Sequence, residues 1–184
     1  DWAIGGVPLK PVSPPNVYAW AWSENIGWIS FNHCDGPSVG CKSIAYGVNV
    51  DPNTGIFSGY AWSDNIGWIS FNRSETGAPP GSPIYGTYLA KADLTDPFLV
   101  FGWARAISAC PSLPCSPGSN QGGWDGWIKL GDEINRQPWQ VRIETSVQPL
   151  EFMGWAWGSD VVGWVSFNCK NQGPCIPSNY KVLL

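Results

Sequence analysis

The chain has 184 residues and a net charge of −4, and its 10 Lys and Arg residues are scattered, which argues against nucleic acid or an anionic membrane surface as the partner. No apolar stretch approaches the ~20 residues that cross a bilayer, so we expect no membrane insertion. Only 13% of the residues are charged, while glycine (22), proline (17) and tryptophan (13) are abundant, a composition typical of short strands separated by turns.

The N-terminal segment, residues 1–16, reads DWAIGGVPLKPVSPPN. Proline cannot occupy the interior of a sheet, so the sequence predicts a Pro-rich arm that precedes one folded domain at residues 17–184. The chain begins at Asp1 without a methionine, as we expect of a processed, secreted protein. In the arm, the apolar residues Trp2, Ile4 and Val7 are candidates for contacts with a second copy of the chain.

The strongest sequence signal is a motif that recurs along the chain. It reads YAWAWSENIGWISFN at 18–32, GYAWSDNIGWISFN at 59–72 and GWAWGSDVVGWVSFN at 154–168, and a degenerate copy is split between FGWARA at 101–106 and DGWIKL at 125–130. Each copy alternates large and small residues on both sides of a turn rich in Asn, Asp, Ser and Gly. We therefore predict two antiparallel strands per copy, joined by that turn.

A shorter segment precedes each later copy and reads YGVNV at 46–50, YGTYL at 85–89 and WQVRI at 139–143. Nothing similar precedes the first copy, whereas the chain ends on a matching YKVLL at 180–184. The sequence thus predicts an all-β fold of about twelve short antiparallel strands in four three-stranded repeats, arranged as a barrel, a sandwich or a small propeller-like ring.

The C-terminal strand at 180–184 completes the first repeat in one of two ways. It returns within the same chain and closes a ring, as the terminal strand of a propeller does. Alternatively, it docks onto the next chain, and a head-to-tail contact that does not close produces a filament. In that second case Tyr180, Val182 and Leu184 are candidate assembly residues.

The regular placement of large aromatic residues in the motif predicts that they form the structural core. A buried Trp removes about 150–250 Å² from water, so a few rings stabilise a repeat that is too small for an ordinary core. The residues expected in this core are Trp20, Trp22, Trp28, Tyr60, Trp62, Trp68, Trp103, Trp127, Trp155, Trp157 and Trp164.

The six cysteines fall into three close pairs in loops rich in Gly, Pro and Ser. Local pairs of this kind are typical of disulfides in an oxidising compartment, which indicates a secreted, extracellular protein. Zinc binding is the competing interpretation, but zinc sites favour CxxC spacing and nearby histidines, and this chain has a single histidine. The predicted disulfides join Cys34 with Cys41, Cys110 with Cys115, and Cys169 with Cys175.

No catalytic constellation is present in the sequence, and we expect a protein that is not an enzyme. The single histidine, His33, lies in an expected disulfide loop. Carboxylates recur at the turn of the motif as Glu24, Asp64 and Asp160, which is typical of turn residues, although a glycosidase pair is the alternative. We expect no cofactor and no metal, with calcium as an alternative at oxygen-rich turns such as the one that begins at Asp51.

The wording GYAWSDNIGWISFN resembles a repeat in uncharacterised tryptophan-rich proteins, secreted or at the cell surface, of candidate-phylum bacteria. The resemblance covers most of residues 17–184. It implies a secreted, repetitive, cell-surface role in a prokaryote. The third copy departs from the pattern because Arg105 stands where the other copies have Trp.

From these observations we expect a non-catalytic extracellular structural protein, a subunit that binds copies of itself in a surface filament or appendage. The alternative is a carbohydrate-binding adhesion module whose partner is a cell-surface glycan. Aromatic rings such as Tyr60 and Trp62 would then form the platform, and Trp2, Trp124 and Trp139, which lie outside the motif, are further surface candidates.

Overall fold

The computed structural model describes residues 15–36, 40–79, 81, 86–90, 98–116 and 120–184. The candidate assembly residues Trp2, Ile4 and Val7 lie outside these ranges. The described residues form an all-β fold, as predicted, with short helical turns α1 (Arg73–Thr76), η2 (Ile107–Ala109), α2 (Ser159–Val162) and η3 (Cys169–Gln172). In the described ranges, none of the helices has the length and apolar character needed to cross a membrane.

Eight strands form a closed antiparallel barrel. They follow one another around it as β1 (Tyr18–Ser23), β2 (Gly27–Ser30), β4 (Phe57–Ser63), β5 (Gly67–Ser70), β7 (Phe98–Ala106), β8 (Trp127–Gly131), β11 (Trp155–Trp157) and β12 (Trp164–Ser166). The barrel closes where β12 pairs with β1, with Trp22 opposite Ser166. Of the predicted arrangements, the barrel is therefore the one that the chain adopts.

Each predicted two-stranded motif forms a hairpin of this barrel. The second strand begins just after or at a glycine with φ between +67° and +77° in every case, namely Gly27, Gly67, Gly126 and Gly163. Such backbone angles suit glycine because it has no Cβ, so the glycine in the turn sequence of the motif determines where each hairpin reverses direction. The resulting hairpins are β1–β2, β4–β5, β7–β8 and β11–β12.

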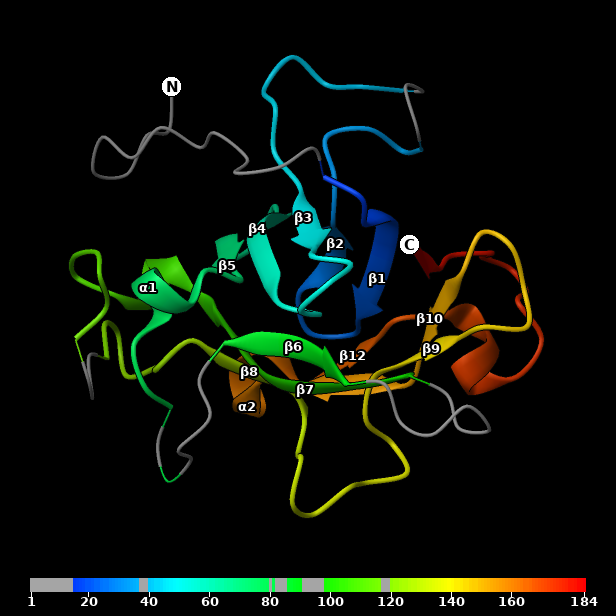
Figure 1. Cartoon of the computed structure of the whole chain (residues 1–184). Coiled ribbons are helices and arrows are strands. Elements are labelled where there is room, and N and C mark those ends of the chain that lie inside the picture. The colour runs from blue at the N-terminus through cyan, green and yellow to red at the C-terminus, as the bar shows by residue number, and fades with distance from the viewer. Residues whose placement is uncertain (1–14, 37–39, 80, 82–85, 91–97, 117–119) are drawn as a thin grey trace.

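Shorter strands extend the barrel at one end. They are β3 (Val48–Val50), which pairs with β4, β6 (Thr87–Ala90), which pairs with β7, β9 (Arg142–Glu144), β10 (Glu151–Met153) and β13 (Val182–Leu183). Strand β13 lies between β1 and β10, and Figure 1 shows the C-terminus beside both. The backbones of Leu150 and Leu184 also exchange hydrogen bonds of 3.2 and 2.9 Å. The C-terminal segment thus pairs within its own chain.

A residue with positive φ recurs at the corresponding position of each hairpin, two residues before the inward-facing alanine of its first strand. Gly59, Gly102 and Gly154 have φ of +87°, +88° and +84°, and Ala19 occupies the corresponding place with φ of +66°. A Cβ on any of the three glycines would lie 1.9–2.3 Å from a backbone carbonyl oxygen of a neighbouring segment. Glycine is therefore required where these backbones approach so closely, and Ala19 carries conformational strain.

The interior of the barrel is filled by small and aliphatic residues together with phenylalanine. The alanines of the first strands and the Ile or Val residues of the second strands are almost completely buried: Ala21, Ala61, Ala104, Ala156, Ile29, Ile69, Ile128 and Val165. Phe31 packs against Phe71 and Phe167 with ring centroids 5.9 and 5.4 Å apart. An eight-stranded barrel is just wide enough for side chains of this size to fill it.

The prediction of an aromatic core is wrong for most of the residues that it named. Trp28 and Trp164 are 41% and 45% exposed, and none of the tryptophans in the described ranges belongs to the central cluster of buried residues. The reason is that neighbours in a strand face opposite ways, and the alanines between the tryptophans face inward. Among the predicted core residues, Tyr60, Trp68 and Trp127 are buried outside that cluster, and the half-buried ones are Trp20, Trp22, Trp62, Trp103, Trp155 and Trp157.

The cysteine prediction is confirmed. Disulfides join Cys34 to Cys41, Cys110 to Cys115 and Cys169 to Cys175. Each bridge closes a loop of only a few residues that follows a barrel strand, so the bridges fix loops on the outside of the barrel rather than linking distant elements.

Candidate functional site

The outer surface of the barrel carries an aromatic cluster on every hairpin. Residues directly opposite each other on paired strands are close enough to interact, and here the opposite residues are Trp22 and Trp28, Trp62 and Trp68, and Trp157 and Trp164. Their ring centroids lie 4.7, 4.6 and 4.9 Å apart at steep interplanar angles. We call these clusters first to fourth in chain order. Trp20 belongs to the first, 6.5 Å from Trp28, and the third contains Trp103 and Trp127, 6.1 Å apart.

The chain itself covers the second cluster. Tyr46, Tyr60, Trp68 and Ile107 form a small buried group. Tyr46 packs edge-on against Trp68 at 5.2 Å, and Ile107 belongs to the turn η2 that follows β7. The rings of this hairpin are thus used to hold two neighbouring loops against the barrel.

Basic side chains of the chain lie over rings of the first and third clusters. The ammonium of Lys42 is 4.9 Å from the centre of a Trp20 ring, and that of Lys129 is 5.3 Å from a Trp103 ring. The guanidinium of Arg105 lies 4.5 Å from Trp127. Cations over indole faces are attracted by the electron-rich ring, so these contacts stabilise the two clusters.

Arg105 explains why the third hairpin departs from the motif. Its side chain is buried, and it donates hydrogen bonds to the carbonyls of Asp125 (2.7 Å) and Thr76 (2.8 Å). Burial lowers the pKa of Arg105, and the charge of Asp125 opposes that shift. A guanidinium stays protonated at physiological pH even so, because its reference pKa is far above neutrality. Arg105 therefore anchors the long insertion between β7 and β8 to the barrel.

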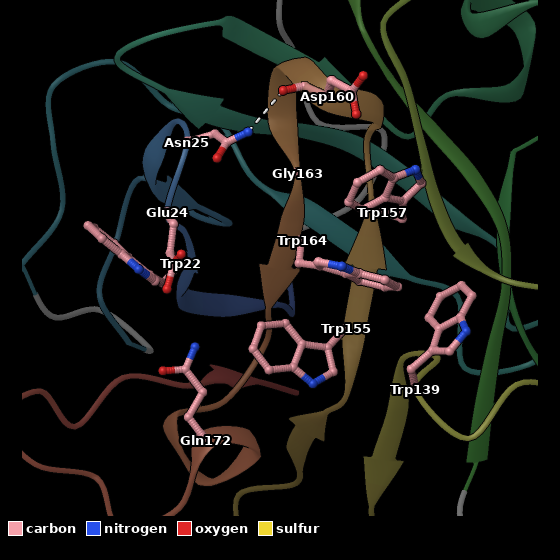
Figure 2. A pocket seen from close by; sticks show the side chains of 10 residues that line it. All are labelled: Trp22, Glu24, Asn25, Trp139, Trp155, Trp157, Asp160, Gly163, Trp164 and Gln172. Carbon is pink, nitrogen blue, oxygen red and sulfur yellow. Dashed lines mark hydrogen bonds between the residues drawn. The ribbon is translucent and has the colours of Figure 1, made fainter.

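The fourth cluster lines an open groove of about 580 Å³. The groove lies over the seam at which β12 pairs with β1, so it combines residues from the two ends of the chain. Figure 2 shows its lining, which consists of Trp22, Glu24, Asn25, Trp139, Trp155, Trp157, Asp160, Gly163, Trp164 and Gln172.

Trp164 is the central ring of this groove. Its centroid lies 4.9 Å from that of Trp157 and 5.2 Å from that of Trp139, with interplanar angles of 54° and 71°. Two neighbouring indoles therefore hold the ring in place, while its 45% exposure leaves part of it open to solvent. Figure 2 shows Trp164 among Trp139, Trp155 and Trp157, with Trp22 and Glu24 across the groove.

The polar residues of the groove come from the turns beside the seam. Asn25 donates from its side-chain amide to the backbone carbonyls of Asp160 (3.0 Å) and Val161 (3.4 Å), and Ser23 donates to that of Val162 (2.6 Å). These bonds tie the first hairpin turn to α2. Among the described residues, no hydrogen bond or ion pair engages the carboxylate of Glu24 or Asp160.

A second, smaller groove of about 330 Å³ adjoins the first. The two share Trp22 and Gln172, and the second groove continues past Trp28 and Tyr180 to the disulfide loop that contains Cys169. Trp28 and Tyr180 meet edge-to-face at 5.5 Å. The two grooves together bring the rings of Trp22, Trp28 and Tyr180 next to those of the fourth cluster.

Several predicted site residues have different roles in the structure. Trp139, predicted at the surface, lines the groove, whereas Trp124 is half-buried against the core. Asp64 accepts a hydrogen bond of 2.7 Å from the indole of Trp62. Tyr180, Val182 and Leu184, the candidate assembly residues of the C-terminal strand, belong to the pairing of that strand within the chain.

Two alternatives for metal binding involve groups that are already engaged. A nitrogen of His33 and the sulfurs of Cys34 and Cys41 lie within 4.8 Å of one another, but the two sulfurs are bonded to each other and so are not thiolate ligands in this state. Asp51 accepts hydrogen bonds from the backbone N–H groups of Thr54 and Asn53, which lower its pKa. It acts there as a turn residue.

The sequence analysis did not locate the groove, because its residues alternate with barrel residues in each strand and lie at opposite ends of the chain. The one available signal was the extra tryptophan at position 139, outside the motif. Comparisons of the chain with protein family models, with curated proteins and with solved structures found no match.

Proposed function

We propose that this protein is a non-catalytic extracellular carbohydrate-binding module that holds a glycan along the aromatic groove. The observation that carries the proposal is the partly exposed ring of Trp164, fixed between Trp139 and Trp157. A large exposed aromatic surface is costly in water and usually marks a binding site. Indole rings stack on the apolar faces of sugar rings and lose little conformational freedom in doing so.

The polar groups and the shape of the groove support a glycan over a small apolar ligand. Glu24, Asn25, Asp160 and Gln172 lie around the rings and offer carboxylate and amide groups to sugar hydroxyls. The groove is open, and the second groove adjoins it at Trp22. An extended chain of sugars fits such a path better than a compact molecule does.

The repeat organisation fits this role. We interpret the hairpins as copies of one unit, because each has a glycine with positive φ where its second strand begins, an inward alanine in its first strand and a residue with positive φ two positions before that alanine. In such an array one copy is free to diverge for binding while the others serve the scaffold. The three disulfides are compatible with a secreted protein at the cell surface.

Self-assembly into a filament is less well supported as the function. Strand β13 already pairs with β1 and β10 of its own chain, so docking onto another chain would require these pairs to open. The arm residues Trp2, Ile4 and Val7 stay candidates for such contacts, outside the described residues. Sedimentation of the purified protein would detect assembly, and a monomer that binds glycan would favour the proposal made here.

The proposal is tested by binding to insoluble and soluble polysaccharides, followed by calorimetric titration of those that bind. We expect Trp164→Ala to reduce affinity at least about 10-fold, as truncation of a central aromatic residue does at binding hot spots. Trp62→Ala is the control, because it removes an indole from the second cluster, and Trp62 does not line either groove. Full binding by Trp164→Ala, or equal losses in both variants, would contradict the proposal.

A further inference from the structure

We propose that the glycan held by this groove carries free ammonium groups, so that the ligand class is a polymer of de-N-acetylated amino sugars. This inference rests on the carbohydrate-binding function proposed above and adds the charge of the ligand. It comes from comparing the aromatic clusters with one another.

Equivalent clusters differ in what covers them. Lys42 lies over the first cluster, Lys129 and Arg105 lie over the third, and apolar side chains close the second. Among the described residues, no Lys or Arg lies over a ring of the fourth cluster or lines its groove. Trp155 has in the fourth hairpin the place that Trp20 and Trp103 have in the first and third. In the described part of the chain no cation covers Trp155, so this ring is left open to a cation from outside.

The charges in the groove select the same kind of ligand. Among the described lining residues, the charged ones are Glu24 and Asp160, and both are carboxylates. Figure 2 shows Glu24 beside Trp22, across the groove from Trp164, and Asp160 at the edge of the groove. The cation nearest in the sheet is Lys129, which lies opposite Trp157. Its ammonium is bound to Asp132 at 2.8 Å and lies over Trp103, so it is directed to the neighbouring cluster.

An ammonium group on a sugar satisfies both features at once. It binds an indole face through the cation–π interaction and a carboxylate through a charge-assisted hydrogen bond. A polyuronate would place its carboxylates against Glu24 and Asp160 and be repelled. A neutral or N-acetylated glycan would stack on the rings but leave both carboxylates without a cationic partner.

A small quaternary ammonium compound shares this chemistry but not the shape. The groove is open along its length and continues into a second groove at Trp22, whereas a single small cation is held best by rings that enclose it. We therefore favour the amino sugar, and tetramethylammonium serves as the probe for the other source.

The test compares hexamers of glucosamine, N-acetylglucosamine and galacturonate by calorimetric titration at pH 6 in low salt. We expect the glucosamine hexamer to bind about 10-fold tighter than the N-acetylated one, as a cation–π contact and an ion pair together provide. The galacturonate hexamer should bind least. Added 0.5 M NaCl should shrink the preference for glucosamine, because salt screens exposed charges.

Two variants that each remove one carboxylate separate the effect of a charge in the groove from the effect of the net charge of the protein. Glu24→Gln should lower the ratio of glucosamine to N-acetylglucosamine affinity several-fold. Glu133→Gln removes the same charge from an exposed loop outside the groove and should leave the ratio as it is. Thermal melts of both variants confirm that the fold is intact.

The outcomes distinguish this inference from the function on which it rests. If the two amino-sugar hexamers bind equally and Trp164→Ala weakens both, the carbohydrate-binding function stands and the charge inference is wrong. If no glycan binds, both fall. Binding of tetramethylammonium without binding of the glucosamine hexamer would overturn the assignment of an amino-sugar ligand.

Discussion

The carboxylate of Glu151 connects the C-terminal segment to the rest of the barrel, and its replacement by Gln tests how much that connection contributes. Glu151 lies at the start of β10, and its side chain is 9% exposed. It accepts hydrogen bonds from Lys181 at 2.6 Å, from Lys170 at 2.8 Å and from the amide of Asn168 at 3.2 Å. Glu151→Gln keeps the shape but leaves both ammonium groups without their anion.

The magnitude follows from the pKa of Glu151. Burial alone would raise it, but the hydrogen bonds from Lys170, Lys181 and Asn168 prevail and lower it from 4.5 to about 2. At about 1.4 kcal/mol per unit, this corresponds to an upper figure of about 3 kcal/mol of stability. The Lys170 and Lys181 side chains are 51% and 29% exposed, and solvent screening reduces the expected value to about 2 kcal/mol.

The sign of the pH dependence is fixed by the same values. The pKa of Glu151 is lower in the folded state than in the unfolded chain, so its contribution is fully present above about pH 4.5 and is lost as the pH falls toward 2. The Gln variant lacks this carboxylate, so its free energy of unfolding does not include the contribution that wild type loses in acid. The two proteins should therefore differ most at pH 7 and converge in acid.

Denaturant unfolding at pH 7, 4.5, 3 and 2, with the disulfides kept oxidised, measures these differences directly. Glu133→Gln, in an exposed loop, is the control and should change the free energy of unfolding by less than about 0.5 kcal/mol. Equal stability of wild type and Glu151→Gln at pH 7, or a difference that grows in acid, would refute the reasoning.

Three further predictions concern the stability of the fold. Ala19→Gly should stabilise the protein by about 0.5–1 kcal/mol, because Ala19 has φ of +66°. Gly59→Ala should destabilise it by at least about 3 kcal/mol, because the new Cβ would lie 2.1 Å from the carbonyl oxygen of Gly47. Denaturant midpoints that move in the opposite directions would disprove this. Deletion of residues 180–184 removes strand β13 and the buried Val182, and should lower the free energy of unfolding by at least about 3 kcal/mol, which an unchanged midpoint would contradict.

Much of the fold could be predicted because its signals are local. The hairpins follow from turn residues and alternation within about fifteen residues, and the disulfides follow from cysteines only a few positions apart. The C-terminal strand could be predicted from its similarity to segments that precede other hairpins. What the strand pattern did not reveal was which of its two faces points inward.

The assignment of the faces failed for a geometric reason. Alternation separates Trp22 from Ala21 but is symmetric between the faces, and burial energy alone favours the larger residue inside. The limited width of the barrel decides otherwise, because alanines and Ile29 fill the interior and the indoles are left outside. That limit depends on the number of strands in the closed barrel, which no single motif determines.

The groove could not be predicted because it exists only after closure. Glu24 and Asp160 belong to turns at opposite ends of the chain, and they line one groove because β12 pairs with β1. Coverage of the other clusters likewise depends on side chains from distant loops, such as Lys42 over Trp20. The sequence of the motif gives no indication of these contacts.

The central claim is that the groove lined by the fourth aromatic cluster binds an amino-sugar ligand. Its most direct test is the ¹⁵N spectrum of the indole N–H groups, recorded as the glucosamine hexamer is added. The account predicts shifts for Trp139, Trp157 and Trp164, and none for the covered rings of Trp68 and Trp127. Uniform shifts, or shifts confined to the covered rings, would contradict it.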